Sequence, residues 1–203
     1  MCIRDRIAYG HVNRHYRFDN YLNRCCDNYP THELGPIAKL LDINRGNRIM
    51  TVSSFASKSA GLSEYIKTRV DATDEMKAAN FAQGDIITTV LTCARGETIL
   101  LRLDTTLPRS YSRDFTVRGT KGLYMQDTNS VFLDGDEEAF EPVKYYAKAL
   151  NNAVKFEDEY LPDIWKSVTE EMLKAGHGGM DWFAYMGFTN ALINGEEMPI
   201  DVY

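Results

Sequence analysis

The chain has 203 residues, of which 44% are hydrophobic and 26% are charged, and its formal net charge is −6. This composition is typical of one sizeable globular domain, and the acidic balance without a Lys/Arg run argues against a nucleic-acid partner. No apolar stretch approaches the roughly 20 residues needed to cross a bilayer, so we expect no membrane contact. The four cysteines form no C-x-x-C pair, which favours free thiols and a cytoplasmic protein.

The first residues lack the features of a targeting signal. Residues 1–6 (Met-Cys-Ile-Arg-Asp-Arg) have no apolar core and no small-residue cleavage site. They resemble a translated sequencing adapter, so we interpret residues 1–6 as a non-native scar and residues 7–203 as one α+β domain. Polar and apolar residues then alternate over 7–27, which predicts an extended strand. His11 and His15 would also share a helix face, but a metal pair lacks a third ligand nearby.

A helix is predicted after this segment. Apolar residues recur at the spacing of one helix face: Leu34, Ile37, Ala38 and Leu41. Gly35 would cap this helix with Pro36 at its first position. Thr31 is a rival cap one turn earlier, although Pro36 would then cost an internal hydrogen bond. The turn at residues 44–46 ends the helix.

Strands dominate the middle of the chain. Residues 50–55 form a short strand, and residues 58–83 are expected to be loop with short helices. The β-branched run 86–93 and the alternating residues 99–105 predict a hairpin with one buried face. Further short strands, separated by glycine turns, are predicted over 115–118, 123–126 and 131–133.

The last third is helical. Trp182 and Tyr185 belong to apolar stripes on different sides of one helix, which predicts a largely buried helix packed against the sheet. Asn194 and Gly195 stop it. Together these elements predict an α+β fold, an open, mostly antiparallel sheet with helices on one face.

Several separated motifs carry a family resemblance. They are residues 29–36 (Tyr-Pro-Thr-His-Glu-Leu-Gly-Pro), 44–46 (Asn-Arg-Gly), 104–113 (Asp-Thr-Thr-Leu-Pro-Arg-Ser-Tyr-Ser-Arg) and 176–181 (Gly-His-Gly-Gly-Met-Asp). In this order they resemble glycoside hydrolase family 109, within the Gfo/Idh/MocA oxidoreductase-like proteins. The resemblance implies an N-terminal Rossmann domain that binds NAD and a C-terminal α+β domain that holds the sugar. This chain has no G-x-G-x-x-G turn, so it resembles the second domain with the Rossmann domain missing. We expect it to be inactive by itself.

The resemblance also implies a reaction, the removal of terminal α-N-acetylgalactosamine. Tightly bound NAD oxidises the sugar at C3, which acidifies the C2 proton; elimination, water addition and reduction follow. The alternative within the same superfamily is an NAD(P)-dependent sugar dehydrogenase with net redox chemistry.

His32 is our candidate for proton transfer. The start of a helix carries partial positive charge and disfavours imidazolium, so a neutral ring can accept a proton near pH 7. The resemblance gives Tyr29 contacts with both substrate and NAD, and it places Pro30 and Thr31 in the same substrate-binding segment. The family often has glycine at the position of Glu33, whose carboxylate either raises the basicity of His32 or faces solvent.

Further residues match substrate-binding positions of the family. Arg17 matches an arginine whose guanidinium can hold sugar oxygens in one plane, and Tyr111 matches a tyrosine that contacts the substrate. The glycines around His177 either admit a ligand or only turn the chain into the next helix.

Other readings of the chain stay open. A conventional glycosidase would use two carboxylates, and acidic residues do cluster on a predicted turn at Asp134, Asp136, Glu137 and Glu138. A non-enzymatic chain would act as a sheet module that mediates oligomer contacts. The resemblance implies that a homo-oligomer could form through the open sheet face, and this role is compatible with catalysis.

Overall fold

The computed structural model describes residues 16–28, 30–104, 106–136 and 147–199. The chain forms two compact units, Met1–Arg113 and Asp114–Tyr203, and each is described separately below. The interpreted scar at residues 1–6, the pair His11 and His15, and Tyr29 lie outside the described residues. The predicted α+β class with antiparallel strands is confirmed.

The first unit contains a three-stranded antiparallel sheet in the order β1-β2-β3. Its strands are β1 (Ile49–Ala56), β2 (Ile86–Cys93) and β3 (Thr98–Asp104). Every second residue of β2 and β3 is buried, which confirms the predicted hairpin with one buried face. β1 is an edge strand and is exposed along most of its length.

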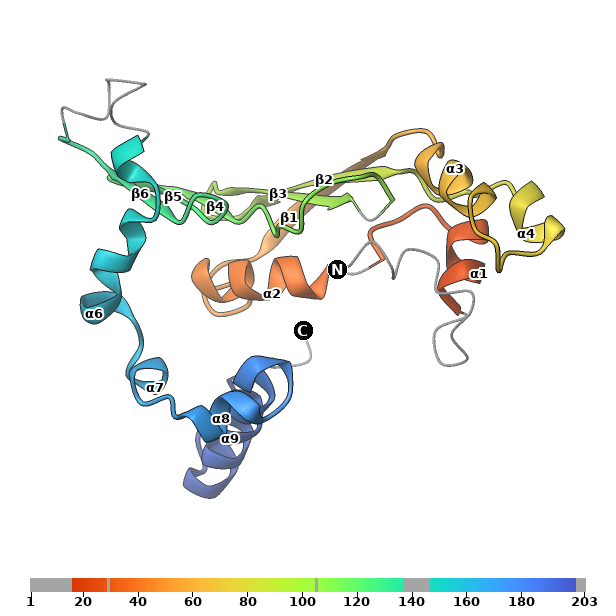
Figure 1. Ribbon diagram of the computed structural model, residues 1–203. Coiled ribbons are helices and arrows are strands. Elements are labelled where there is room, and N and C mark those ends of the chain that lie inside the picture. Colours follow the sequence, from red (N-terminus) through yellow and green to blue (C-terminus); the bar gives the residue numbers. More distant parts are fainter. Residues whose placement is uncertain (1–15, 29, 105, 137–146, 200–203) are drawn as a thin grey trace. The chain divides into compact units, whose positions relative to one another are not determined.

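Helix α2 (Thr31–Leu40) covers the buried face of this sheet (Figure 1). Leu34 and Ile37 pack against a core that includes Leu91 and Leu101. The helix begins at Thr31 with Pro30 as its N-cap, so the predicted start at Pro36 is wrong. The rival prediction is correct in placing the start one turn earlier, but Thr31 is the first helical residue and not the cap. Burying the apolar face of an additional helical turn outweighs the hydrogen bond that Pro36 cannot donate.

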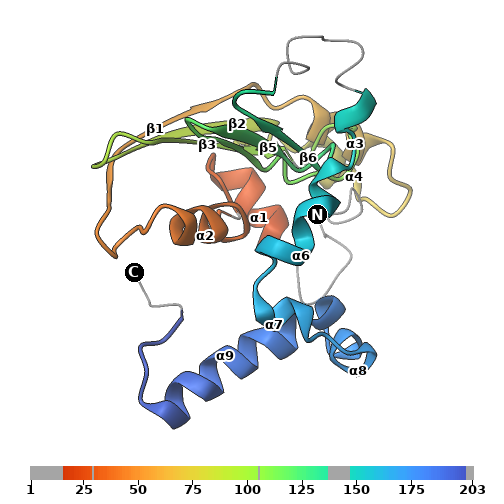
Figure 2. The same cartoon turned by 90° about the vertical axis from the view of Figure 1, so that its left-hand side faces the viewer.

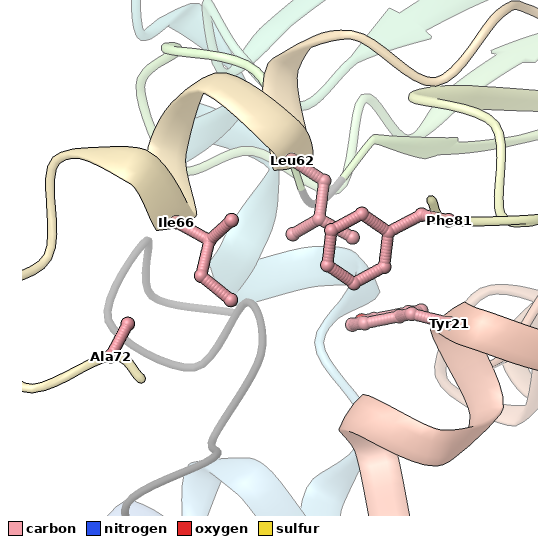
Figure 3. Close-up of a cluster of buried hydrophobic side chains, with 5 residues drawn as sticks. All are labelled: Tyr21, Leu62, Ile66, Ala72 and Phe81. Carbon is pink, nitrogen blue, oxygen red and sulfur yellow. The ribbon is translucent and has the colours of Figure 1, made fainter. Parts of the chain in front are cut away.

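Helix α1 (Tyr16–Asn23) replaces the strand predicted over the described part of residues 7–27. Tyr21 is buried, and Phe18 and Leu22 pack against the same core, at the i, i+3 and i+4 spacing of a helix. The partners of Tyr21 come from later segments: Leu62, Ile66, Ala72 and Phe81 (Figure 3). The strand prediction failed because this long-range packing, not the alternation seen before residue 20, decides the local structure. Both α1 and α2 lie on one side of the sheet (Figures 1 and 2).

The segment between β1 and β2 holds the expected short helices, α3 (Gly61–Lys67) and α4 (Asp74–Ala78). Asp85, just before β2, caps the N-terminus of α3. Its carboxylate accepts hydrogen bonds from the backbone amides of Ala60, Gly61 and Leu62. The strand and the helix are thereby joined at one point.

The second unit begins with another antiparallel sheet, in the order β4-β5-β6. Its strands, β4 (Thr116–Arg118), β5 (Gly122–Met125) and β6 (Ser130–Leu133), confirm the predicted short strands. Short helical segments follow: η3 (Asn152–Phe156), α6 (Glu157–Tyr160), α7 (Asp163–Lys166), α8 (Glu170–Lys174) and η4 (His177–Gly179). The Asn152 side chain bonds both the amide and the carbonyl of Val131, so η3 is tied to β6.

Helix α9 (Met180–Asn194) ends at Gly195 in the left-handed conformation, as predicted. The prediction that it is largely buried is wrong: Tyr185 is 74% exposed and Ile193 is 75% exposed. Its apolar residues surround the helix, and the neighbouring segments α8 and η4 are too short to cover them all. None of the helices in the described part of the chain has the length and apolar character needed to span a membrane.

Candidate functional site

The first turn of α2 displays the predicted site residues to solvent. Thr31 and His32 are both exposed, and the Thr31 hydroxyl lies 3.5 Å from Nδ1 of His32. Pro30 occupies the N-cap position, and its carbonyl accepts hydrogen bonds from the amides of Glu33 (3.1 Å) and Leu34 (2.7 Å). Because Leu34 is packed under the sheet, this turn is held in place while His32 stays accessible.

Glu33 connects this turn to other segments of the first unit. The pKa of Glu33 is raised to about 7, first by burial and then by the charge of Asp27, while the charge of Arg109 lowers it. Because charge interactions weaken with distance, Asp27 and Arg109 are the charges that act on the first turn of α2. Arg109, in the loop that follows β3, is thus electrostatically coupled to the turn that carries His32.

That loop, of which the structure describes residues 106–113, carries Tyr111. The Tyr111 side chain is 63% exposed, and its hydroxyl accepts a hydrogen bond of 3.4 Å from Nε of Arg113. Near the start of the loop, the buried hydroxyl of Thr106 donates to the Asp85 carboxylate at 3.0 Å. The loop is thus anchored to the cap of α3 and presents an exposed phenol.

A buried glutamine orders the segment just before α2. Gln83 is 2% exposed, and its side-chain oxygen accepts hydrogen bonds from Nδ2 of Asn28 at 2.8 Å and from the amide of Cys26 at 3.3 Å. The backbone N–H of Gln83 donates to the carbonyl of Tyr21 in α1 at 3.0 Å. Gln83 therefore links α1 to the chain that leads into the predicted site.

The structure places the predicted site residues on separate segments of the first unit. Pro30, Thr31 and His32 lie at the start of α2, and Tyr111 lies in the loop after β3, where the charge of Arg109 acts on Glu33 of α2. Arg17 lies on α1 and is partly buried, and its role in sugar binding stays a prediction. The role of Tyr29 also stays a prediction, because it lies outside the described residues.

Sequence reasoning missed the polar residues that support this site. Gln83 and Asp85 bond groups many positions away in the chain, so no local spacing marks them. Arg109 bonds backbone carbonyls no more than five positions away, but a side chain that bonds the backbone leaves no periodic pattern in the sequence. The only signal was that Arg109 stands within a motif of the family resemblance.

The second unit contains another histidine with an acidic partner. His177 Nδ1 lies 2.9 Å and 3.1 Å from the two carboxylate oxygens of Asp181. His177, Gly178 and Gly179 all have positive φ, so the glycines do turn the chain sharply into α9. A Cβ on Gly176 would lie 2.2 Å from Oδ2 of Asp181, so this glycine also makes room for the pair.

The other predicted features have simpler structural explanations. Asp134 and Asp136 are exposed on the turn after β6, whereas Glu137 and Glu138 lie outside the described residues. The strands β1 to β6 pair only in antiparallel fashion, so the described elements contain no βαβ unit of a dinucleotide-binding domain. The described elements therefore do not form the strand-to-helix turn that holds the phosphates in a dinucleotide-binding domain.

Comparison with known proteins gives consistent matches over almost the whole chain. The family model described as "Glycosyl hydrolase 109, C-terminal domain" matches residues 7–203. A Stenotrophomonas maltophilia (strain K279a) protein named "Glycosyl hydrolase family 109 protein" is 40% identical over 195 residues, which cover 96% of this chain and 41% of that protein. The Tannerella forsythia "Alpha-N-acetylgalactosaminidase" is 34% identical over 194 residues, 96% of this chain and 40% of that protein. The Shewanella oneidensis protein of the same name is 33% identical over 176 residues, 86% of this chain and 38% of that protein. The chain thus spans about two-fifths of the length of these curated relatives.

Proposed function

Because this chain belongs to glycosyl hydrolase family 109, we propose that it forms the sugar-binding part of an NAD-dependent glycoside hydrolase that removes terminal α-N-acetylgalactosamine. The names of the T. forsythia and S. oneidensis relatives support this substrate. The observation that supports the proposal is the exposed first turn of α2, which displays His32 and is electrostatically coupled, through Glu33 and Arg109, to the loop that displays Tyr111.

Each residue has a distinct role in this proposal. His32 moves a proton at the sugar, since a histidine can exchange protons near neutral pH. The hydroxyls of Thr31 and Tyr111 hold sugar oxygens, and the guanidinium of Arg17 holds two oxygens in one plane. Pro30 shapes the backbone of the binding segment, and Tyr29 contacts both the sugar and the cofactor.

NAD dependence is part of the same proposal. The dinucleotide would be bound outside the described residues, which contain no βαβ unit. The chain spans about two-fifths of its relatives, which leaves ample length in such proteins for a cofactor domain. We therefore propose that the 203-residue chain has no glycosidase activity by itself.

The test is an assay of a full-length protein that contains this chain, with p-nitrophenyl α-N-acetylgalactosaminide and no added NAD. The expected result is release of nitrophenol without accumulation of NADH, because the cofactor is reduced and reoxidised within each turnover. NADH accumulation from the free sugar in the presence of NAD, without glycoside cleavage, would instead support the dehydrogenase. The isolated chain is the matched control and should release no nitrophenol.

The open face of the first sheet supports a second, compatible role in self-association. Phe55 is 67% exposed and Leu100 is 63% exposed, and both lie on the face opposite the one that α2 covers, together with Val90. Exposed apolar side chains gathered on one face are typical of protein interfaces. In our proposal a second copy covers this face.

Light scattering after size exclusion should give a dimer or larger species. Leu100→Glu should dissociate it, whereas Val70→Glu, at a 97% exposed position elsewhere in the unit, should not. A monomeric wild type would contradict this role.

A further inference from the structure

Arg109 is the centre of the loop that carries Tyr111. Its Nε donates a hydrogen bond of 2.8 Å to the carbonyl of Asp104, at the end of β3. Its Nη1 donates to the carbonyl of Ser110 at 2.9 Å and to that of Ser112 at 3.3 Å. The last two residues are the immediate neighbours of Tyr111 on either side. One guanidinium therefore holds the backbone both before and after the tyrosine.

We infer that Arg109 is a positioning residue, which fixes the backbone around Tyr111 and so presents this side chain to the sugar. The inference deepens the proposed function and rests on it for the identity of the ligand. Nothing in the family match or in the names of the relatives assigns a role to Arg109.

The chemistry of the loop requires an arginine at this position. A guanidinium is planar and carries N–H donors in several fixed directions, so one side chain can serve three carbonyls at once. A lysine ammonium is a single point and cannot reach both neighbours of Tyr111 as well as Asp104. The Asp104 carboxylate lies 3.5 Å from Nε of Arg109, so this partly buried cation has a counter-charge.

The surroundings of the loop suit a preorganised contact residue. Asp104 Oδ1 accepts a hydrogen bond from the amide of Leu107 at 3.4 Å, which folds the start of the loop. The Tyr111 ring remains 63% exposed although its backbone is held, so its exposure does not follow from a loose loop. A fixed backbone with an accessible phenol lowers the entropy lost when a ligand binds. The charge of Arg109 also lowers the pKa of Glu33, which lies in the turn that displays His32.

Digestion of the 203-residue chain with chymotrypsin tests whether Arg109 holds the backbone around Tyr111, without any assumption about activity. Chymotrypsin cleaves after exposed tyrosines, and cleavage requires the backbone to open locally. We expect Arg109→Lys to raise cleavage between Tyr111 and Ser112 about tenfold, since two hydrogen bonds are lost. Cleavage after Tyr160, which is 69% exposed in the other unit, serves as the reference within the same digest.

Arg95→Lys is the matched control, because Arg95 forms an exposed ion pair with Asp42 at 3.1 Å in the same unit but lies outside this loop. It should leave the ratio of the two cleavages unchanged. An unchanged ratio in Arg109→Lys would overturn the inference, whatever the protein does to sugars. Should Arg109→Lys fail to fold, Asp104→Asn is the second variant, because it removes the counter-charge of Arg109. It should raise cleavage after Tyr111 relative to cleavage after Tyr160, to a smaller extent than Arg109→Lys.

Kinetics of a full-length protein then test the link to the sugar. We expect Arg109→Lys to raise KM for the α-N-acetylgalactosaminide about tenfold while kcat changes less than about threefold, because a binding residue is misplaced and the proton-transfer group is not. Faster digestion with an unchanged KM would overturn the role in sugar binding. A wild-type protein without glycosidase activity would contradict the proposed function, and this outcome is distinguishable because the digestion result does not depend on it.

Discussion

Glu33, in the first turn of α2, and Arg109, in the loop after β3, interact electrostatically across the two segments that display His32 and Tyr111. This carboxyl adds a titratable group between the two segments. Its partial burial beside Asp27 makes it costly to ionise, and Arg109 offsets only part of this cost.

The raised pKa of Glu33 makes stability depend on pH in a defined direction. Between the ordinary value of 4.5 and about 7, the folded state holds a proton that the unfolded state has lost. Stability therefore falls as pH rises through this window. We expect Glu33→Gln to remove this fall and to be more stable than wild type above the window by on the order of 1 to 2 kcal/mol, after allowance for solvent screening.

Urea unfolding across this pH window measures the effect. Glu64→Gln is the control, because Glu64 is an exposed acid paired with Lys67 and should not change the pH dependence. Parallel stability curves for wild type and Glu33→Gln would show that Glu33 ionises normally in the folded protein.

Local patterns predicted those elements whose burial follows a simple period. The alternation in β2 and β3 identified the hairpin and its buried face, because both strands lie on a core that covers one side. The pattern in α2 identified its buried face, but Pro36 misled us about its first residue. Helix α1 was missed because Tyr21 is buried by Phe81 and Ile66, which are distant in the sequence.

In the candidate site, too, some residues could be predicted from local sequence and others could not. A short motif and a family resemblance were enough to select His32, Thr31 and Tyr111 as candidates. Gln83 could not be selected, because its partners Asn28 and Cys26 are brought near only by the fold. Arg109 bonds residues close to it in the sequence, yet it could not be selected either. Polar residues that bond to backbone carbonyls and amides leave no periodic signal.

His32 is expected to be essential for glycoside cleavage by a full-length protein. His32→Ala should lower kcat by about a hundredfold to ten-thousandfold, the range typical of a lost general acid or base. Lys39→Ala, an exposed change later on α2, should leave kcat unchanged. Substantial activity of His32→Ala, measured by nitrophenol release, would favour a two-carboxylate glycosidase instead.

Asp85 is expected to stabilise the first unit through charged hydrogen bonds. Burial by itself raises the pKa of Asp85, but hydrogen bonds from the amides of Gly61, Ala60 and Leu62 and from the Thr106 hydroxyl outweigh it and lower the pKa below its ordinary value. The resulting stability is present above the ordinary value of 3.8 and is lost as pH falls through the folded-state pKa.

Asp85→Asn should therefore cost about 1 to 3 kcal/mol at neutral pH, and this cost should shrink in acid. Urea unfolding at neutral and acidic pH gives both quantities. Asp74→Asn, at an exposed acid in the first turn of α4, should change stability by less than about 0.5 kcal/mol. A cost for Asp85→Asn that does not depend on pH would mean that the carboxylate charge is not what stabilises the cap.

Gln83 is expected to matter for both stability and sugar binding. Gln83→Met keeps the approximate volume but leaves the amide of Cys26 and the side chain of Asn28 without their acceptor. Unsatisfied donors in a partly buried setting cost about 1 to 3 kcal/mol in unfolding free energy. Asn23→Ala removes an exposed hydrogen bond to the carbonyl of Asp19 and should cost less than about 0.5 kcal/mol. Because Asn28 directly precedes the predicted binding segment, Gln83→Met should also raise KM in a full-length protein, whereas Asn23→Ala should not. A variant that loses stability but binds the sugar normally would show that Gln83 supports the core and not the site.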